Sequence, residues 1–316
     1  MTVAVILALY SAFAALVLPR FLRRAAWTDR APRLAIAMWQ AASASVVISA
    51  LLSAFAVAVP ASVVGHGLAG LFEACAALLG DEATLSTTST RVGLIAAGLV
   101  LARLAYTGGA VLLGARRERR HHADALTLLG RHDLDLDAVV VDYDERMAYC
   151  LPGRKGHAVI TTAALRSLAP EHVAAVLAHE QAHLRGRHHL LLAAAETVTR
   201  AFPRVPLFEQ ARAEVARLVE LLADDVAASR HPRIHIAAAL VRLATGRVPA
   251  FALGAGGETA LMRVRRMLNP QAPLGRRERL AGLLAVTVLL AGPATLALVP
   301  GVSVFLAHHC HSFLGL

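Results

Sequence analysis

The sequence predicts a mainly α-helical protein in which four transmembrane helices accompany one cytoplasmic α+β domain with a small sheet. Of the 316 residues, 57% are hydrophobic and 17% are charged, which is too apolar for a single soluble globule of this size. The apolar residues gather in four segments, each long enough to cross a hydrocarbon core that needs about 20 helical residues. A longer stretch of mixed polarity separates the third segment from the fourth and predicts the folded domain.

The first three apolar segments define a membrane region over residues 1–114. They are expected as helices at about 2–18, 34–59 and 92–114, and a fourth is expected at about 280–299 within the C-terminal region 280–316. The first segment resembles a signal peptide in length, but its positive charges follow the apolar run and no small-residue cleavage pattern precedes Arg20. We therefore interpret it as a retained signal-anchor helix.

The charges of the connecting segments predict the orientation. Residues 19–33 carry five arginines against one aspartate, so this connection is expected in the cytoplasm. Residues 60–91 carry three acidic residues against one arginine and are expected outside, whereas the arginine-rich stretches that begin at Arg116 and Arg276 are cytoplasmic by the same rule. The sequence therefore predicts a multi-pass cell-membrane protein with both termini extracytoplasmic and residues 115–279 in the cytoplasm.

The net charge of +10 is explained by these arginine clusters at the cytoplasmic face of the bilayer. Direct nucleic-acid binding is not expected, because no aromatic residues alternate with the basic clusters and no zinc-finger or basic-zipper spacing occurs. The three cysteines do not form a disulfide framework. Cys150 is expected to be reduced in the cytoplasm, while Cys75 and Cys310 are both expected outside, where pairing stays an open alternative. A metal site at His308–His311 is a further alternative to a disordered tail.

The cytoplasmic domain begins with a β-rich stretch. Strands are predicted at Val139–Val141, Met147–Leu151 and His157–Thr161, where β-branched residues are frequent, and Pro152 and Gly153 separate the last two. This pattern predicts a small sheet that ends in a hairpin.

Helical periodicity replaces the strand pattern after this sheet. Pro170 suits a first helical position, Glu171 lies in the first turn, and Val173, Val176 and Leu177 recur at helical spacing. Two further helices are predicted, at Glu214–Ser229 and at Ala260–Leu268.

The first of these helices contains the sequence HEQAH. Residues four apart lie on one face of a helix, so His179 and His183 can direct imidazole nitrogens at one zinc ion. Glu180 then lies beside the metal and can accept a proton from the water that attacks a peptide carbonyl. About 0.03 chance matches to H-E-x-x-H are expected in a chain of this composition, which disfavours the alternative of a histidine-rich solvated helix.

A catalytic zinc site requires a third protein ligand. The acidic candidates in the domain are Glu196, Glu209, Glu214, Glu220, Asp224 and Asp225. We favour Glu220, because Asp224 lies one turn farther along the same face and can orient a ligating histidine. Glu196 is the alternative, since it is closer in sequence to the motif.

The stretch YCLPGRKGHAVITTAALRSLAPEHVAAVLAHEQAHLRGRHH, followed by VELLADDVA, resembles the integral-membrane zinc peptidases of the gluzincin type, which include HtpX and the CaaX prenyl proteases. The four-helix topology is most similar to the BlaR/MecR antirepressor peptidases. The resemblance implies a zincin-like metalloprotease domain with Zn²⁺ held by His179, His183 and Glu220. It also implies that Glu180 is the catalytic base and that Asp224 orients a ligand.

Two departures from these families affect the expectations. The segment after the fourth helix is too short for the penicillin-binding domain that BlaR/MecR sensors carry, so direct β-lactam acylation is not expected. Many relatives also have a His-Pro element before a segment like LMRVRRML, and this chain has no histidine there. The group that stabilises the oxyanion is therefore left open among Arg263, Arg265, His231 and His235.

The last predicted strand has a possible role in substrate binding. An exposed edge strand near the metal can bind a peptide backbone by strand addition. The candidate comprises His157, Ala158, Val159, Ile160 and Thr161, and an ordinary structural edge is the alternative.

These observations lead to the hypothesis of a membrane-embedded zinc endopeptidase that acts on a protein or peptide substrate at the cytoplasmic side. By resemblance, a cytoplasmic transcriptional repressor is a candidate substrate. The rival hypothesis is a non-catalytic signal transducer or scaffold with a structural zinc site. Metal transport is disfavoured, because the polar residues in the predicted spans are mostly serine and threonine.

Overall fold

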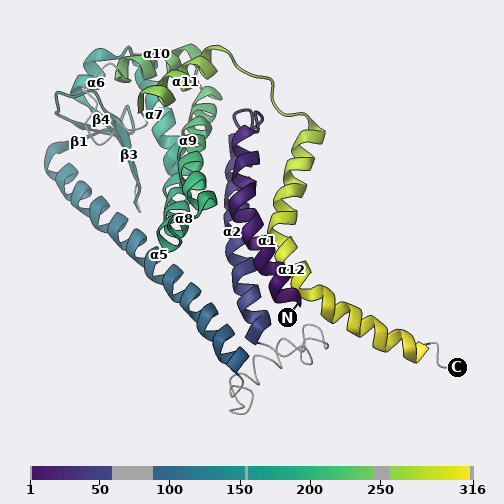
Figure 1. The fold of residues 1–316 in the computed structure, drawn as a ribbon. Coiled ribbons are helices and arrows are strands. Elements are labelled where there is room, and N and C mark those ends of the chain that lie inside the picture. The colour runs from purple at the N-terminus through teal and green to yellow at the C-terminus, as the bar shows by residue number, and fades with distance from the viewer. Residues whose placement is uncertain (1, 59–87, 154–155, 245–255, 314–316) are drawn as a thin grey trace.

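A computed structural model describes residues 2–58, 88–153, 156–244 and 256–313, and the side chains of all of these except 256–259 and 299–313. Four of its helices are long and apolar enough to cross a membrane. They are α1 (Thr2–Arg24), α2 (Pro32–Ala58), α5 (Thr88–Leu129) and α12 (Arg276–Phe313), of which the qualifying part of α12 is Arg276–Leu298 (Figure 1). Each predicted apolar segment coincides with one of these helices. The alternatives at Cys75, Cys310 and His308–His311 lie outside the described side chains.

Helix α5 continues beyond the predicted end of its span at Gly114. Its second half contains mostly arginine, alanine, glutamate and leucine, which are strong helix formers, and no proline interrupts it. Figure 1 shows the helix running from the far end of the bundle to the small sheet. The boundary expected between membrane region and domain, at residues 114 and 115, therefore falls inside one continuous helix.

The sheet has four strands in the order β1-β2-β4-β3. They are β1 (Gly130–Asp133), β2 (Ala138–Val141), β3 (Ala148–Leu151) and β4 (His157–Thr161). Strand β4 is parallel to β2 and antiparallel to β3, and β1 is antiparallel to β2. The prediction omitted β1, whose sequence GRHD has no β-branched residue to indicate a strand.

The expectation that His157–Thr161 forms an exposed edge strand is wrong. Strand β4 lies between β2 and β3, and Val159 is aligned with Val139 on one side and Tyr149 on the other. The backbone of β4 is therefore used on both sides within the sheet. The four residues from Ala158 to Thr161 are buried, as suits a central strand, and β3 is the edge strand that packs against the motif helix.

Six helices belong to the described part of the domain. They are α6 (Thr162–Ser167), α7 (Pro170–Arg185), α8 (His188–Ala201), α9 (Pro206–Ala228), α10 (Arg233–Ala244) and α11 (Gly256–Leu268). Helix α7 starts at Pro170 as predicted. Helix α9 begins earlier than Glu214, because Pro206 occupies its first turn and Leu207 and Phe208 extend its buried face.

The domain and the first two helices share one hydrophobic core. Trp39 of α2 and Phe208 and Leu218 of α9 are almost fully buried in the same cluster, which also includes residues of α1. A second cluster lies between the sheet and α7, with Ile160 and Val176 among its members. Helix α9 thus packs against α1 and α2 directly, as Figure 1 shows.

Polar contacts reinforce this junction. Asp29, in the connection between α1 and α2, lies 2.7 Å from Arg217 of α9, and its backbone carbonyl accepts a hydrogen bond from Arg266 of α11. The Arg266 guanidinium also donates two hydrogen bonds of 2.8 Å to Asp225. The connection predicted to be cytoplasmic between the first two spans is therefore joined to α9 and α11.

Candidate metal centre

Helix α7 places the two motif histidines on its inner face. Val173, Val176 and Leu177 are buried on the same helix and anchor it to the domain core. His179 follows them and is itself buried, while His183 lies one turn farther on and is partly buried. The ring centroids of the two histidines are 4.8 Å apart.

The carboxylate of Glu220 on α9 faces the two imidazoles. The Nε2 atoms of His179 and His183 are 3.0 Å apart, and each lies 3.5 Å from a different oxygen of Glu220. Ligands about 2.05 Å from a tetrahedral zinc ion are about 3.3 Å from one another. The three side chains therefore fit a zinc ion, and among the described residues they form the only such group.

Asp224 supports the first histidine. Its side chain is fully buried, and its Oδ1 atom lies 2.9 Å from Nδ1 of His179. A carboxylate at this position holds Nδ1 protonated, which leaves Nε2 free as a metal-binding lone pair. Glu220 and Asp224 are one turn apart on α9, so the same face of this helix supplies both carboxylates of the cluster.

Arg263 of α11 pairs with both carboxylates. Its Nε and one terminal nitrogen donate to Asp224 at 2.8 and 2.7 Å, and its other terminal nitrogen lies 2.9 Å from Glu220. Among the four oxyanion candidates of the sequence, this is the residue that the structure brings to the cluster. Arg265 is exposed on the same helix, and His235 contacts His172 in an edge-to-face arrangement with ring centroids 5.6 Å apart.

His188 is a site residue that the sequence did not predict. It starts α8, is buried, and its Nδ1 atom lies 3.0 Å from Nδ1 of His183. The neighbouring Gly186 leaves room for this ring, since a Cβ there would collide with His188. The histidine-rich sequence RGRHH was the only available signal, and it equally suits a solvated helix end.

The charges of the cluster shift several pKa values. Burial opposes the charge of both carboxylates, yet His179 and Arg263 lower the pKa of Glu220 and of Asp224 to about 2. Burial also opposes protonation of His179, but Asp224 and Glu220 outweigh it and raise its pKa to about 9. Burial lowers the pKa of His183 to about 4 despite Glu220. Both carboxylates are therefore ionised at neutral pH, which is the form in which Glu220 can bind a metal.

Glu180 lies beside the cluster and is partly buried. Burial raises the pKa of its carboxyl group, although His179 opposes this shift. Burial and the nearby Glu180 also raise the pKa of Cys150, on the edge strand β3, to about 12, so Cys150 is a neutral thiol. A carboxylate with a raised pKa suits a general base.

The other acidic candidates lie elsewhere. Glu196 on α8 pairs with Arg200 at 2.6 Å and with Arg212 at 3.5 Å. Glu209 accepts a hydrogen bond from the backbone of Arg204. Glu214 pairs with Arg217 at 2.9 Å and Asp225 pairs with Arg266, so of the six candidates the structure brings only Glu220 and Asp224 to the histidines.

The comparison with known families bears on this geometry. Residues 115–244 match the model of peptidase family M48. The matched segment contains HEQAH, Glu220 and Asp224, and it supports a metallopeptidase of the zincin type. No curated protein and no solved structure matches the chain.

Proposed function

We propose that the protein is an integral-membrane zinc endopeptidase that hydrolyses peptide bonds of a protein substrate at the cytoplasmic side. The grouping of His179, His183 and Glu220 beside Glu180 carries this proposal. The three would hold a zinc ion, which when bound polarises a carbonyl oxygen and acidifies a water molecule.

Residues of the chain would transfer the proton, orient a ligand and stabilise negative charge. Glu180 accepts the proton of the attacking water and passes it to the leaving amine. Asp224 keeps His179 in the tautomer that presents Nε2, and Arg263 holds Asp224 with a two-point contact. A terminal nitrogen of Arg263 also lies 3.5 Å from Nε2 of His179. We therefore assign to Arg263 the stabilisation of negative charge on the substrate carbonyl oxygen.

The edge strand β3 replaces β4 as the proposed site for the substrate backbone. It packs against α7 and contains Cys150, whose pKa is raised by the nearby carboxyl group of Glu180 as well as by burial. A peptide that adds to the free side of β3 would run past the proposed base. This placement supports an endopeptidase, because strand addition requires no free peptide terminus.

The arrangement of the four long helices supports the proposed topology. The start of α1 and the end of α12 lie away from the sheet, at the opposite end of the bundle (Figure 1). With the arginine-rich connection at 19–33 in the cytoplasm, the sheet and the metal cluster lie on the cytoplasmic side and both termini outside. By resemblance, the substrate would be a signalling protein such as a transcriptional repressor.

The number of protein donors favours catalysis over a structural zinc site. Structural zinc sites are almost always closed by four protein ligands. The described residues supply three, which leaves the fourth position for the water molecule that a catalytic site requires. The scaffold hypothesis requires a fourth ligand and no turnover.

Replacing Glu180 by Gln tests the proposal. We expect Glu180→Gln to retain zinc, since the ligands are intact, and to lose proteolysis by a factor of about 10² or more. New N-termini in cells expressing the wild-type or variant protein would be compared by mass spectrometry, with zinc measured in the purified proteins.

Glu171→Gln provides the matched control. Glu171 lies in the exposed first turn of the same helix, so the same substitution there should leave cleavage unchanged. An unchanged set of N-termini in Glu180→Gln would exclude the peptidase mechanism.

A further inference from the structure

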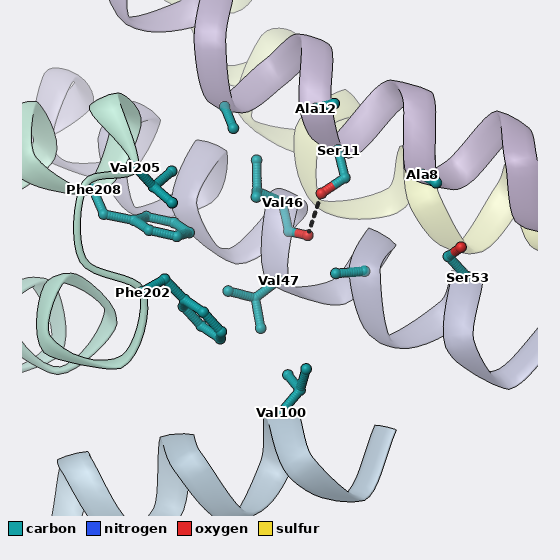
Figure 2. Close-up of a pocket in the computed structure, with 12 residues that line it drawn as sticks. Ala8, Ser11, Ala12, Val46, Val47, Ser53, Val100, Phe202, Val205 and Phe208 are labelled. Carbon is teal, nitrogen blue, oxygen red and sulfur yellow. Dashed lines mark hydrogen bonds between the residues drawn. The ribbon is translucent and has the colours of Figure 1, made fainter. Parts of the chain in front are cut away.

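A cavity of about 420 Å³ lies among the long helices, and none of its lining residues belongs to the metal cluster. This volume is in the range of about 300–1,000 Å³ that is usual for small-molecule sites. Figure 2 shows α1 on one side, α2 behind, α5 on the opposite side and the connection between α8 and α9 at one end. Small side chains of α1 and α2, such as Ala8, Ala12 and Ala50, create the space.

The lining offers no unpaired hydroxyl group. Ser11 donates a hydrogen bond of 3.2 Å to the carbonyl of Val46, and Ser53 donates one of 2.8 Å to the carbonyl of Ala4. The other lining side chains are alanine, valine and phenylalanine. A water molecule needs two to four polar partners, so this surface favours an apolar ligand.

The position of the cavity indicates the source of such a ligand. Lining residues come from three helices of membrane-spanning length, and α2 packs against both α1 and α5, so we place the opening of the cavity between α1 and α5. Leu9 and Phe13 on α1 and Leu99 on α5 are large exposed hydrophobic residues that adjoin lining residues in the sequence. In a bilayer these residues contact hydrocarbon, and the cavity is continuous with that environment.

The end of the cavity is closed by Phe202, Val205 and Phe208. Arg103 of α5 donates to the carbonyl of Ala201, and Thr199 donates to the carbonyl of Phe208 at 3.0 Å, so this segment is held in place on both sides. Phe208 belongs to α9, the helix that also carries Glu220 and Asp224. A ligand in the cavity therefore touches the helix that serves the metal cluster.

We propose that this cavity binds the hydrocarbon chain of a membrane lipid. The chain enters between α1 and α5, lies along α2, and ends against the two phenylalanines. This inference rests on the membrane insertion that is part of the proposed function, but not on proteolysis.

Photolabelling of the full-length protein tests it. The Glu180→Gln protein would be reconstituted in phosphatidylcholine nanodiscs that contain a phosphatidylcholine with a diazirine near the end of one acyl chain. After irradiation, we expect adducts to concentrate on the lining segments of α1, α2 and the α8–α9 connection, including Phe202 and Phe208.

Variants that fill the cavity distinguish lipid bound inside it from lipid that contacts the outer surface of the helices. Ala50→Phe, from α2, and Val100→Phe, from α5, should each lose the adducts on Phe202 and Phe208. Ala102→Phe adds the same ring to an exposed position of α5 outside the lining and should retain them. Two filling variants on different helices guard against one of them failing to fold, which size-exclusion chromatography would reveal.

Adducts spread evenly over the outer faces of α1 and α5, or adducts on Phe202 and Phe208 that persist in both filling variants, would overturn the inference. Because Glu180→Gln is used throughout, these results do not depend on peptidase activity. Absence of cleavage by the wild-type protein would instead count against the proposed function alone.

Discussion

Glu220 and Asp224 contact different atoms of the motif histidines. Glu220 faces the Nε2 atoms of His179 and His183, whereas Asp224 reaches only the Nδ1 atom of His179. The difference follows from their spacing, because one turn of α9 shifts a side chain by about 5.4 Å along the helix. The residue nearer the ligand nitrogens is the proposed ligand, and the other fixes the tautomer.

Asp224→Asn is expected to weaken zinc binding by about 10–100-fold, because the amide cannot hold Nδ1 of His179 as a carboxylate does. Zinc affinity would be measured by competition with a chelator. Asp225→Asn is the matched control, since Asp225 pairs with Arg266 and does not reach the histidines. Equal affinities in the two variants would contradict the role of Asp224.

His188 is expected to hold His183 in the same way. If Nε2 of His183 binds zinc, its Nδ1 carries the proton and donates to Nδ1 of His188. Burial lowers the pKa of His188, which keeps it neutral and able to accept.

His188→Ala should therefore lower zinc affinity by about tenfold or more, whereas His189→Ala should not. Gly186→Ala tests the same contact independently, because its added Cβ would displace the His188 ring. Wild-type affinity in both His188→Ala and Gly186→Ala would show that the contact has no positioning role.

At the scale of elements, two helices of the bundle approach through a glycine. A Cβ on Gly93 of α5 would lie 2.5 Å from the carbonyl oxygen of Ala54 and 2.7 Å from the backbone nitrogen of Ala58, both on α2. Such small residues allow helix backbones to pack closely in membranes.

Gly93→Ala should destabilise the protein by about 1–3 kcal/mol, because α5 must move away from α2. Gly98→Ala on the same helix meets nothing within 4 Å and should be neutral or slightly stabilising. Thermal unfolding in detergent would compare the two. A Gly93→Ala protein as stable as Gly98→Ala would mean that the α2–α5 contact is looser in solution.

The strands show where local patterns are insufficient. Val159 and Ile160 indicate a strand from their β-branched side chains, but the same pattern suits an edge and a centre. The order β1-β2-β4-β3 depends on β4 returning parallel to β2, which is a long-range pairing. The motif helix, in contrast, was predictable because Pro170 and the apolar spacing are local signals.

At the scale of the whole molecule, α9 joins the metal cluster to the long helices. It shares a core with α1 and α2, contributes the proposed ligand, and borders the apolar cavity. One continuous helix therefore connects the core of α1 and α2 with Glu220.

Cysteine labelling tests the proposed topology. In a background without the native cysteines, Thr88→Cys should react with a membrane-impermeant maleimide in intact cells, and Ser229→Cys should react only after the membrane is opened. Both positions are exposed in the structure, at the start of α5 and at the end of α9. The reverse labelling pattern would indicate the opposite orientation in the membrane, with the metal cluster outside.

Local and compositional information in the sequence determined the four apolar helices, the strands at 139–141, 147–151 and 157–161, and the helix that carries HEQAH. It also selected Glu220 and Asp224, because their spacing on one helix is itself a local property. Tertiary structure alone decided that β3 rather than β4 is the edge strand, that Arg263 and His188 reach the cluster, and that α9 packs into the core of α1 and α2. These features depend on contacts between residues distant in the chain, for which helical and strand periodicity carry no signal.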